Sequence, residues 1–270
     1  MRLLLFLILL GLFFGVPCAG SVVGGGWASG CPALEILQKT IELHGTGAGE
    51  VNIFRFALRL LMSLRPFRKP LPDGIVDGGS FLDKIKSGLR VDRIEETPIP
   101  FRCIACKDDG TFARKVFRKG PLLPAIYSSM SIPGVVIPRP GDDAGNTYYD
   151  GGIVEKTPLK SVISDHARMG SGRRLVLICT HFGNEAAQMP QKGFLRRLLG
   201  TISALEDQLW DYQLAEARAR EDVTVVLLNP KLHERGMFNF ERAERMYLAA
   251  REVSSQQLGS AQIGQSLGLV

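Results

Sequence analysis

The chain has 270 residues, of which 45% are hydrophobic and 22% are charged, and its formal net charge is +6. This composition excludes an intrinsically disordered chain, which has too few apolar residues to bury a core. The length fits one large α/β domain, with two small domains as the alternative. The modest positive charge favours an anionic surface, but no basic run is interleaved with aromatic residues, so a nucleic-acid partner is not expected.

An apolar run opens the chain. Residues 3–14 are apolar, follow Met1 and Arg2, and precede small residues at 18–20. Such a run has the length of a signal-peptide hydrophobic region and is too short for a relaxed membrane span. Residues 1–20 are therefore expected to be a signal peptide or membrane anchor, which predicts a membrane-associated or secreted protein. The alternative is a buried first strand of a parallel sheet in a cytoplasmic protein.

Two glycine-rich turns follow. Residues 21–23 predict a short strand entering Gly24-Gly25-Gly26, and a helix is predicted over residues 32–42. The second turn, residues 44–50, precedes a helix predicted over residues 51–64. Glycines between a strand and a helix let backbone N–H groups converge on an anion, either a phosphate or the oxyanion of an acyl transfer. An ordinary structural turn is the alternative for both.

The rest of the chain alternates strands with helices, which predicts a layered α/β fold. Strands are predicted over residues 100–106, 112–117, 148–150, 174–179 and 223–228, and helices over residues 81–87, 121–130, 195–217 and 240–253. The helix over 195–217 has a candidate interruption at Gly200. The domain is expected to span residues 21–253. Residues 254–270, rich in Ser, Gln and Gly, are expected to form a flexible tail.

The five cysteines give no disulfide framework, because their number is odd and their spacing is wide. Cys103 and Cys106 form a C-x-x-C pair, but a zinc site would need a second pair or nearby histidines. Two half-buried strand thiols are therefore expected. No metal ion and no cofactor are predicted.

The second glycine turn has the spacing of a nucleophile elbow, G-x-S-x-G. Residues 45–49 read Gly-Thr-Gly-Ala-Gly, so Gly47 stands where the serine belongs and has no side chain that can attack a carbonyl. Asp150-Gly151-Gly152 follows a predicted strand, where a carboxylate can act as the base for a serine. Alone, this tripeptide is a common turn, and residues 77–79 repeat it.

Together these segments resemble the patatin-like phospholipase family. The resemblance runs from about Val22 to Arg251 and also includes residues 74–79, 97–101, 129–135 and 240–251. It implies a three-layer α/β fold with a mostly parallel central sheet flanked by helices. It also implies hydrolysis of a phospholipid or other lipid ester by a Ser–Asp dyad.

The resemblance assigns roles by position. Asp150 is the dyad base, and Gly151 and Gly152 complete the motif turn. The oxyanion loop consists of Gly24, Gly25 and Gly26, while Gly47 holds the nucleophile position without a hydroxyl. In the family a serine attacks the ester, the aspartate takes its proton, and backbone amides hold the oxyanion.

The sequence departs from the family at further positions. Ser29 stands where the family usually has a basic residue, Lys156 stands where it usually has asparagine, and residues 31–44 are a shortened stretch. Two functions remain open. One is a catalytically inactive patatin-fold protein that binds lipid or a partner, and the other is an active lipid hydrolase with a substitute nucleophile, for which Ser29 is nearest in sequence.

Membrane contact is a separate hypothesis. Residues 51–69 combine aromatic and aliphatic residues with Arg and Lys. A basic amphipathic helix of this kind can lie on an anionic bilayer. The favoured alternative is a buried helix following the elbow, with a solvated basic rim.

Overall fold

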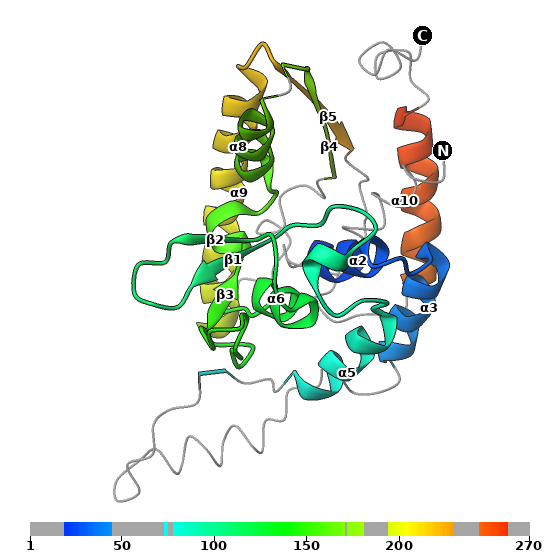
Figure 1. The fold of residues 1–270 in the computed structure, drawn as a ribbon, viewed down its shortest axis with the longest axis vertical. Coiled ribbons are helices and arrows are strands. Elements are labelled where there is room, and N and C mark those ends of the chain that lie inside the picture. The colour runs from blue at the N-terminus through cyan, green and yellow to red at the C-terminus, as the bar shows by residue number, and fades with distance from the viewer. Residues whose placement is uncertain are drawn as a thin grey trace, which may run out of the picture. The chain divides into compact units, whose positions relative to one another are not determined.

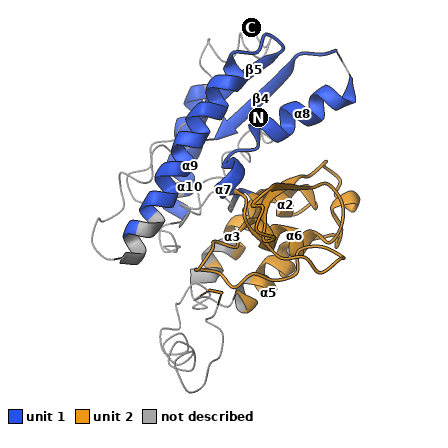
Figure 2. Ribbon diagram, turned by 90° about the vertical axis from the view of Figure 1, so that its left-hand side faces the viewer, with its two compact units in different colours: residues 1–20, 152–270 blue, residues 21–151 orange. Residues whose placement is uncertain are grey.

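The computed structural model describes residues 19–44, 73–74, 78–170, 172–180, 194–228 and 243–258 (Figure 1). It divides the chain into two compact units (Figure 2). The first, here called the N-terminal unit, is residues 21–151, and the second, the C-terminal unit, is residues 152–270 together with residues 1–20. The boundary lies between Gly151 and Gly152, inside the Asp-Gly-Gly turn. The domain bounds that the sequence predicts, residues 21–253, stay a prediction.

The N-terminal unit is built around a three-stranded antiparallel sheet of order β2-β1-β3. Its strands are β1 (Cys103–Lys107), β2 (Arg114–Phe117) and β3 (Tyr148–Asp150). Its helices are α2 (Ala19–Ala28), α3 (Ala33–His44), α5 (Gly79–Gly88), the one-turn η1 (Ile94–Glu96) and α6 (Leu122–Ser129). The helices predicted over 32–42, 81–87 and 121–130, and the three strands, are confirmed with small shifts at their ends. Helix α6 packs against β1 and β3.

The strand predicted over residues 21–23 is wrong. These residues and Gly24-Gly25-Gly26 belong to helix α2. Each glycine in a helix interior is about 1 kcal/mol less favourable than alanine, so local propensity does not explain the helix. Close packing does: a Cβ atom at Gly25 would lie 2.4 Å from Ile126 Cδ1, and one at Gly26 would lie 3.3 Å from Ile36 Cδ1. The glycines thus allow α2 to approach α6 and α3 closely.

The C-terminal unit contains a β–α–β arrangement. Strand β4 (Leu175–Thr180) and strand β5 (Val223–Leu228) pair in parallel, and the long helix α9 (Phe194–Arg218) lies between them in the chain. The other helices are α7 (Gly152–Glu155), α8 (Leu159–Met169) and α10 (Ala243–Leu258). A shared core is formed by Leu159, Leu177, Cys179, Trp210, Leu214, Ala217 and Val223.

Three details of this unit correct the sequence predictions. Helix α9 runs through Gly200 without the predicted interruption, and a Cβ atom there would have no neighbour within 4 Å. Helix α10 continues to Leu258 rather than ending at Val253, and Ser254 is fully buried. Strand β4, which its apolar sequence predicts to be fully buried, is only partly buried, because Val176 is 40% exposed. The helix predicted over 51–64 lies outside the described residues.

The strand pairing agrees only in part with the mostly parallel sheet that the family resemblance implies. Among the described strands, β4 and β5 pair in parallel, whereas β1 pairs antiparallel with both neighbours. Parallel pairing is therefore found in the C-terminal unit only. Of the helices within the described ranges, none combines the length and the apolar character needed to cross a membrane. Residues 1–18 lie outside those ranges.

Candidate active site

Asp150 ends strand β3 and is 2% exposed. Its backbone N–H donates to the carbonyl oxygen of Ser131 at 2.9 Å, and the N–H of Gly151 donates to that of Ser129 at 3.4 Å. Two segments that carry the family resemblance, residues 129–135 and the Asp150 turn, are therefore joined by backbone hydrogen bonds. The short strand β3 gains its fixed position from this second partner as well as from β1.

Gly151 is required by its surroundings. A Cβ atom at this position would lie 2.3 Å from the backbone carbonyl oxygen of Ile104 on β1. A backbone oxygen cannot move aside as the end of a flexible side chain can, so no other residue fits without displacing β1. In the Asp-Gly-Gly turn at 150–152, the backbone of Gly151 therefore lies directly against the backbone of β1, which a residue with a side chain would prevent. This close approach holds Asp150 against the sheet.

The face of the sheet that carries Asp150 also carries a charged and aromatic cluster. Ala105 pairs with both Asp150 and Lys115, and directly paired residues share one face. The Lys115 Nζ atom lies 5.3 Å from the ring centroid of Phe117 and 5.6 Å from that of Tyr148. It lies 3.8 Å from Asp142 Oδ2, which also accepts a 2.6 Å hydrogen bond from the Tyr148 hydroxyl. This cluster fastens the loop before β3 to the sheet.

The cluster has a titratable centre, Asp142. Burial raises its pKa, but hydrogen bonds from Asn146 and Tyr148 and the charge of Lys115 outweigh burial and lower the pKa from 3.8 to about 2. Burial and the hydrogen bond to Asp142 raise the pKa of Tyr148 to about 12. A carboxylate with a lowered pKa stabilises the fold above its unfolded pKa, and this stabilisation is lost as the pH falls through the folded value.

Asp142→Asn is therefore expected to lower the free energy of unfolding by about 2 kcal/mol at pH 7. The difference between variant and wild type should shrink below pH 4 and vanish near pH 2. Urea denaturation across this pH range measures it. Asp143→Asn is the control, because the Asp143 side chain is 67% exposed and its ion pair with Arg93 should contribute less than about 1 kcal/mol. Equal effects of the two variants at pH 7 would contradict the prediction.

The nucleophile position, Gly47, lies outside the described residues. Ser29, the nearest substitute, is 2% exposed, and its hydroxyl donates to the carbonyl oxygen of Gly26 at 2.6 Å. It also accepts from the backbone N–H of Arg90 at 3.2 Å. A serine nucleophile must give its single proton to a base. In this conformation the Ser29 hydroxyl uses its single hydrogen in a hydrogen bond to the carbonyl oxygen of Gly26 and does not offer it to a base. Ser29 therefore has a structural role.

The four cysteines in the described residues are also poor substitutes. All are buried and free. Burial, with Asp109, Asp150 and Asp108 nearby, raises the pKa of Cys106 to about 11, and burial alone raises that of Cys103 further. Because the thiolate is the nucleophile, these thiols are unreactive at neutral pH. The expectation of two strand thiols on β1 is confirmed, but both are fully buried rather than half-buried.

The predicted oxyanion loop does not have the geometry expected for it. Gly24, Gly25 and Gly26 are the sixth to eighth residues of helix α2. At such positions backbone N–H groups donate to carbonyls four residues earlier and are not open to an anion. An oxyanion role for these glycines stays a prediction, and it requires this segment to leave the helical conformation.

The residues that follow Asp150 carry buried charges that the sequence analysis did not combine. Lys156 Nζ lies 2.7 Å from Asp207 Oδ1 on α9, and the two side chains are 8% and 9% exposed. The carboxylate of Glu155 accepts from the N–H of Ser161 at 2.8 Å and from its hydroxyl at 2.5 Å. Gln213 Nε2 donates to the carbonyl oxygen of Val154 at 3.4 Å. Helix α7 is thus fastened to α8 and α9 by polar contacts.

The described residues contain no group of three or more His, Cys, Asp or Glu side chains arranged to hold a metal ion. The chemistry available at Asp150 is that of a buried carboxylate on a rigid strand end. It can accept a proton from a hydroxyl presented to it.

Comparison with known proteins identifies the family. The model of the patatin-like phospholipase family matches residues 18–163, which include the first glycine segment, the Gly47 position and the Asp150 turn. This chain belongs to the patatin-like phospholipase family. The three-layer α/β architecture of that family follows for the matched part.

The patatin-like chain is similar to curated relatives from mycobacteria. An uncharacterized NTE family protein of Mycobacterium tuberculosis (strain ATCC 25618 / H37Rv) is 34% identical over 95 residues, which cover 35% of this chain and 25% of the relative. A second, from Mycobacterium tuberculosis (strain CDC 1551 / Oshkosh), is 26% identical over 268 residues, covering 86% of this chain and 45% of the relative. A third, from Mycobacterium bovis, has the same identity and coverage as the second. The chain spans less than half the length of these relatives.

Proposed function

We propose that this protein binds lipid esters in a patatin-like site and does not hydrolyse them, because it lacks the serine hydroxyl at Gly47. The fold and the base position support lipid-ester binding: the family match covers Asp150, which is buried and held at a strand end by Ser131 and by the close approach of Gly151 to Ile104. The family acts on lipid esters, so an acyl ester with a polar head group is the expected ligand.

The observation that carries the proposal is the absence of a side chain at Gly47, for which neither Ser29 nor the thiols of β1 supply a substitute. The Ser29 hydroxyl is committed to the carbonyl oxygen of Gly26, and the thiols of Cys103 and Cys106 are held protonated by burial. Without a nucleophile, an acyl-transfer site keeps only the contributions of binding and oxyanion stabilisation. An active hydrolase that uses Ser29 is the second candidate, and it requires the α2–Ser29 contact to break.

A turnover and binding experiment tests the proposal. Wild-type protein, Asp150→Ala and Ser29→Ala are incubated with a short-chain p-nitrophenyl ester and with a monomeric short-chain phospholipid, and release of product is followed. Binding of a non-hydrolysable ether analogue is measured in parallel by calorimetry. We expect the wild-type protein to bind the ether analogue and to hydrolyse the two esters no faster than the Asp150→Ala variant does. Wild-type turnover abolished by Asp150→Ala would overturn the proposal, and turnover also abolished by Ser29→Ala would identify Ser29 as the nucleophile.

A further inference from the structure

The turn between β1 and β2, residues 108–113, presents an exposed aromatic ring in an unfavourable backbone conformation. Phe112 is 57% exposed and has φ of +50°. In the part of the chain that the structure describes, it is the one non-glycine residue with positive φ. Bulky L-residues are disfavoured there, and glycine or asparagine usually occupies such a position. Both the exposure and the backbone argue against a purely structural reason for phenylalanine.

The turn is held in place by its own contacts. Cys106 Sγ, from the buried end of β1, donates to the carbonyl oxygen of Phe112 at 3.3 Å, and the N–H of Thr111 donates to Asp109 Oδ1 at 3.0 Å. A single exposed apolar side chain is by itself ordinary. Leu34, which is 68% exposed on the regular helix α3, is such a case. Phe112 differs because a fixed turn presents it at the tip of a hairpin.

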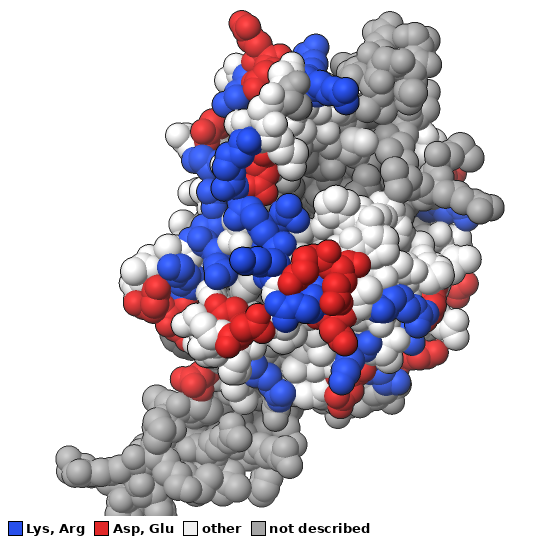
Figure 3. Space-filling model, in the orientation of Figure 1, with Lys and Arg blue, Asp and Glu red and all other residues white. Residues whose placement is uncertain are grey.

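The hairpin that carries Phe112 is basic. Residues 102–119 contain six Lys or Arg residues and two Asp residues, a difference of +4. The two acids have partners within the unit: Asp108 accepts from the Thr147 hydroxyl at 2.9 Å, and Asp109 Oδ2 lies 3.8 Å from Lys107 Nζ. Lys and Arg side chains gather over the region of β1 and β2 in Figure 3. Basic residues around an exposed aromatic ring match the chemistry of an anionic bilayer surface, in which the ring enters the interface and the cations meet the head groups.

We propose that the β1–β2 hairpin is a membrane-contact element that inserts Phe112 into the interface of an anionic phospholipid bilayer. The same three-stranded sheet carries Asp150, so this contact would bring the lipid-ester site to a lipid surface. The inference adds a bilayer to the proposed function but does not depend on turnover. Removal of the side chain should weaken membrane binding without weakening the fold, since the native backbone at this position suits a smaller polar residue better.

The test compares full-length variants on vesicles of phosphatidylcholine and phosphatidylserine. Phe112→Asn removes the ring and suits the left-handed backbone, whereas Leu34→Gln removes an equally exposed apolar side chain from the same unit. Co-sedimentation gives the partition coefficient, and urea denaturation gives the free energy of unfolding. We expect Phe112→Asn to lower the partition coefficient about tenfold, the effect of withdrawing one phenylalanine ring from an apolar phase, while the free energy of unfolding stays equal or rises. Leu34→Gln should change neither quantity.

A second variant gives a positive readout. Phe112→Trp should keep vesicle binding, and its emission should shift to shorter wavelength only when vesicles are added, because tryptophan favours the membrane interface. The inference is overturned if Phe112→Asn partitions like the wild type, if Leu34→Gln lowers binding equally, or if Phe112→Trp emission does not respond to vesicles. Hydrolysis is not part of the readout. Failure here and failure of the proposed function are therefore distinguishable.

Discussion

Gly47→Ser is expected to hydrolyse a short-chain p-nitrophenyl ester at least about a hundredfold faster than the wild-type protein. Removal of the nucleophile from a well-studied serine hydrolase lowers kcat by roughly 10⁶-fold, so even partial recovery of the dyad should be measurable. The residue predicted as the base has a fixed backbone: Asp150 is buried, its N–H donates to Ser131, and Gly151 closes the turn against β1. The rate is measured with purified protein at constant substrate concentration.

Two variants separate a restored dyad from an unspecific effect. Gly47→Ala adds the same Cβ atom without a hydroxyl and should remain as inactive as the wild type. Gly47→Ser combined with Asp150→Ala should lose the gained activity, because the new serine then has no base. Activity in Gly47→Ala, or activity that survives the loss of Asp150, would show that the position predicted for the nucleophile is not part of a Ser–Asp dyad.

The elements that the sequence predicted correctly are those in which local pattern and packing agree. Strands β1 and β2 with their Asp108-Asp109-Gly110 turn, helix α6 and the strand pair β4–β5 all lie close to their predicted limits. Each combines a clear hydrophobic period with turn residues at its ends. The local pattern of residues 148–152, a short strand entering a glycine turn, likewise placed Asp150 correctly at the end of a strand.

Helix α2 could not be predicted because its stability is not local. Three consecutive glycines argue against a helix, and a strand followed by a turn is the natural interpretation of Val22-Val23-Gly24. The helix depends instead on close packing of Gly25 against Ile126 and of Gly26 against Ile36. Both isoleucines belong to other helices, so these contacts form only when the chain folds. The glycine turn assumed for the predicted oxyanion loop is replaced by this helix for the same reason, while the oxyanion role of Gly24, Gly25 and Gly26 stays a prediction.

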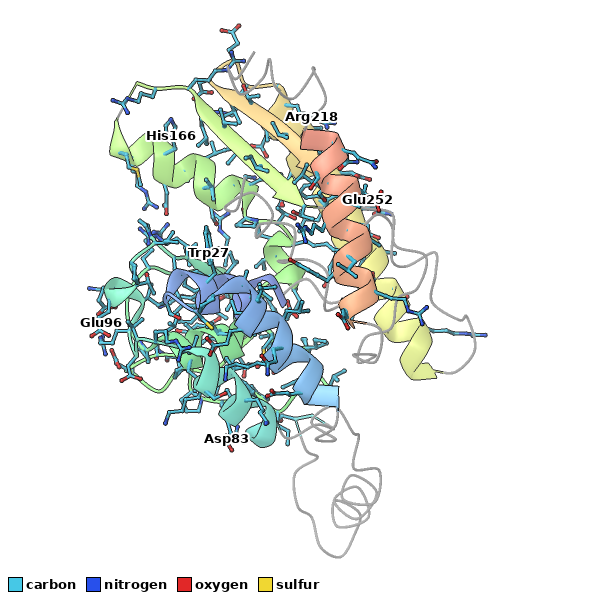
Figure 4. All side chains as sticks on the ribbon, turned by 90° about the vertical axis from the view of Figure 1, so that its right-hand side faces the viewer. Trp27, Asp83, Glu96, His166, Arg218 and Glu252 are labelled. Carbon is cyan, nitrogen blue, oxygen red and sulfur yellow. The ribbon has the colours of Figure 1, made fainter. Side chains whose placement is uncertain are left out.

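The buried ion pair was missed although the sequence contains a signal for it. Ser203, Asp207, Trp210 and Leu214 recur at helical spacing on one face of α9, and all four are buried. A charged residue within such a face predicts a buried partner, because an unpaired charge is costly in an apolar surrounding. The partner, Lys156, had been noted only as a departure from the family. Figure 4 draws the side chains on the ribbon, and many of them end in nitrogen or oxygen atoms, so sequence spacing alone does not select this pair.

Lys156→Met is expected to lower the free energy of unfolding by about 3–5 kcal/mol, because it removes one partner of a buried ion pair and keeps the apolar volume. Asp207, 6% exposed, would retain a buried carboxylate whose Oδ1 has lost a contact at 2.7 Å. Its Oδ2 has no hydrogen-bond partner within the described structure. Thermal and urea denaturation of the full chain measure the loss.

The chain offers a matched control within the C-terminal unit, an exposed ion pair that also ends on α9. Lys160 on α8 lies 3.3 Å from Glu216 on α9, but these side chains are 50% and 49% exposed, so Lys160→Met should cost less than about 1 kcal/mol. Lys156→Met combined with Asp207→Leu should recover most of the loss, since replacing both partners by apolar groups removes the uncompensated charge. If Lys156→Met cost no more than Lys160→Met, the pair would not be fastening the segment after α7 to α9, and the carboxylate of Asp207 would have to reach water without Lys156.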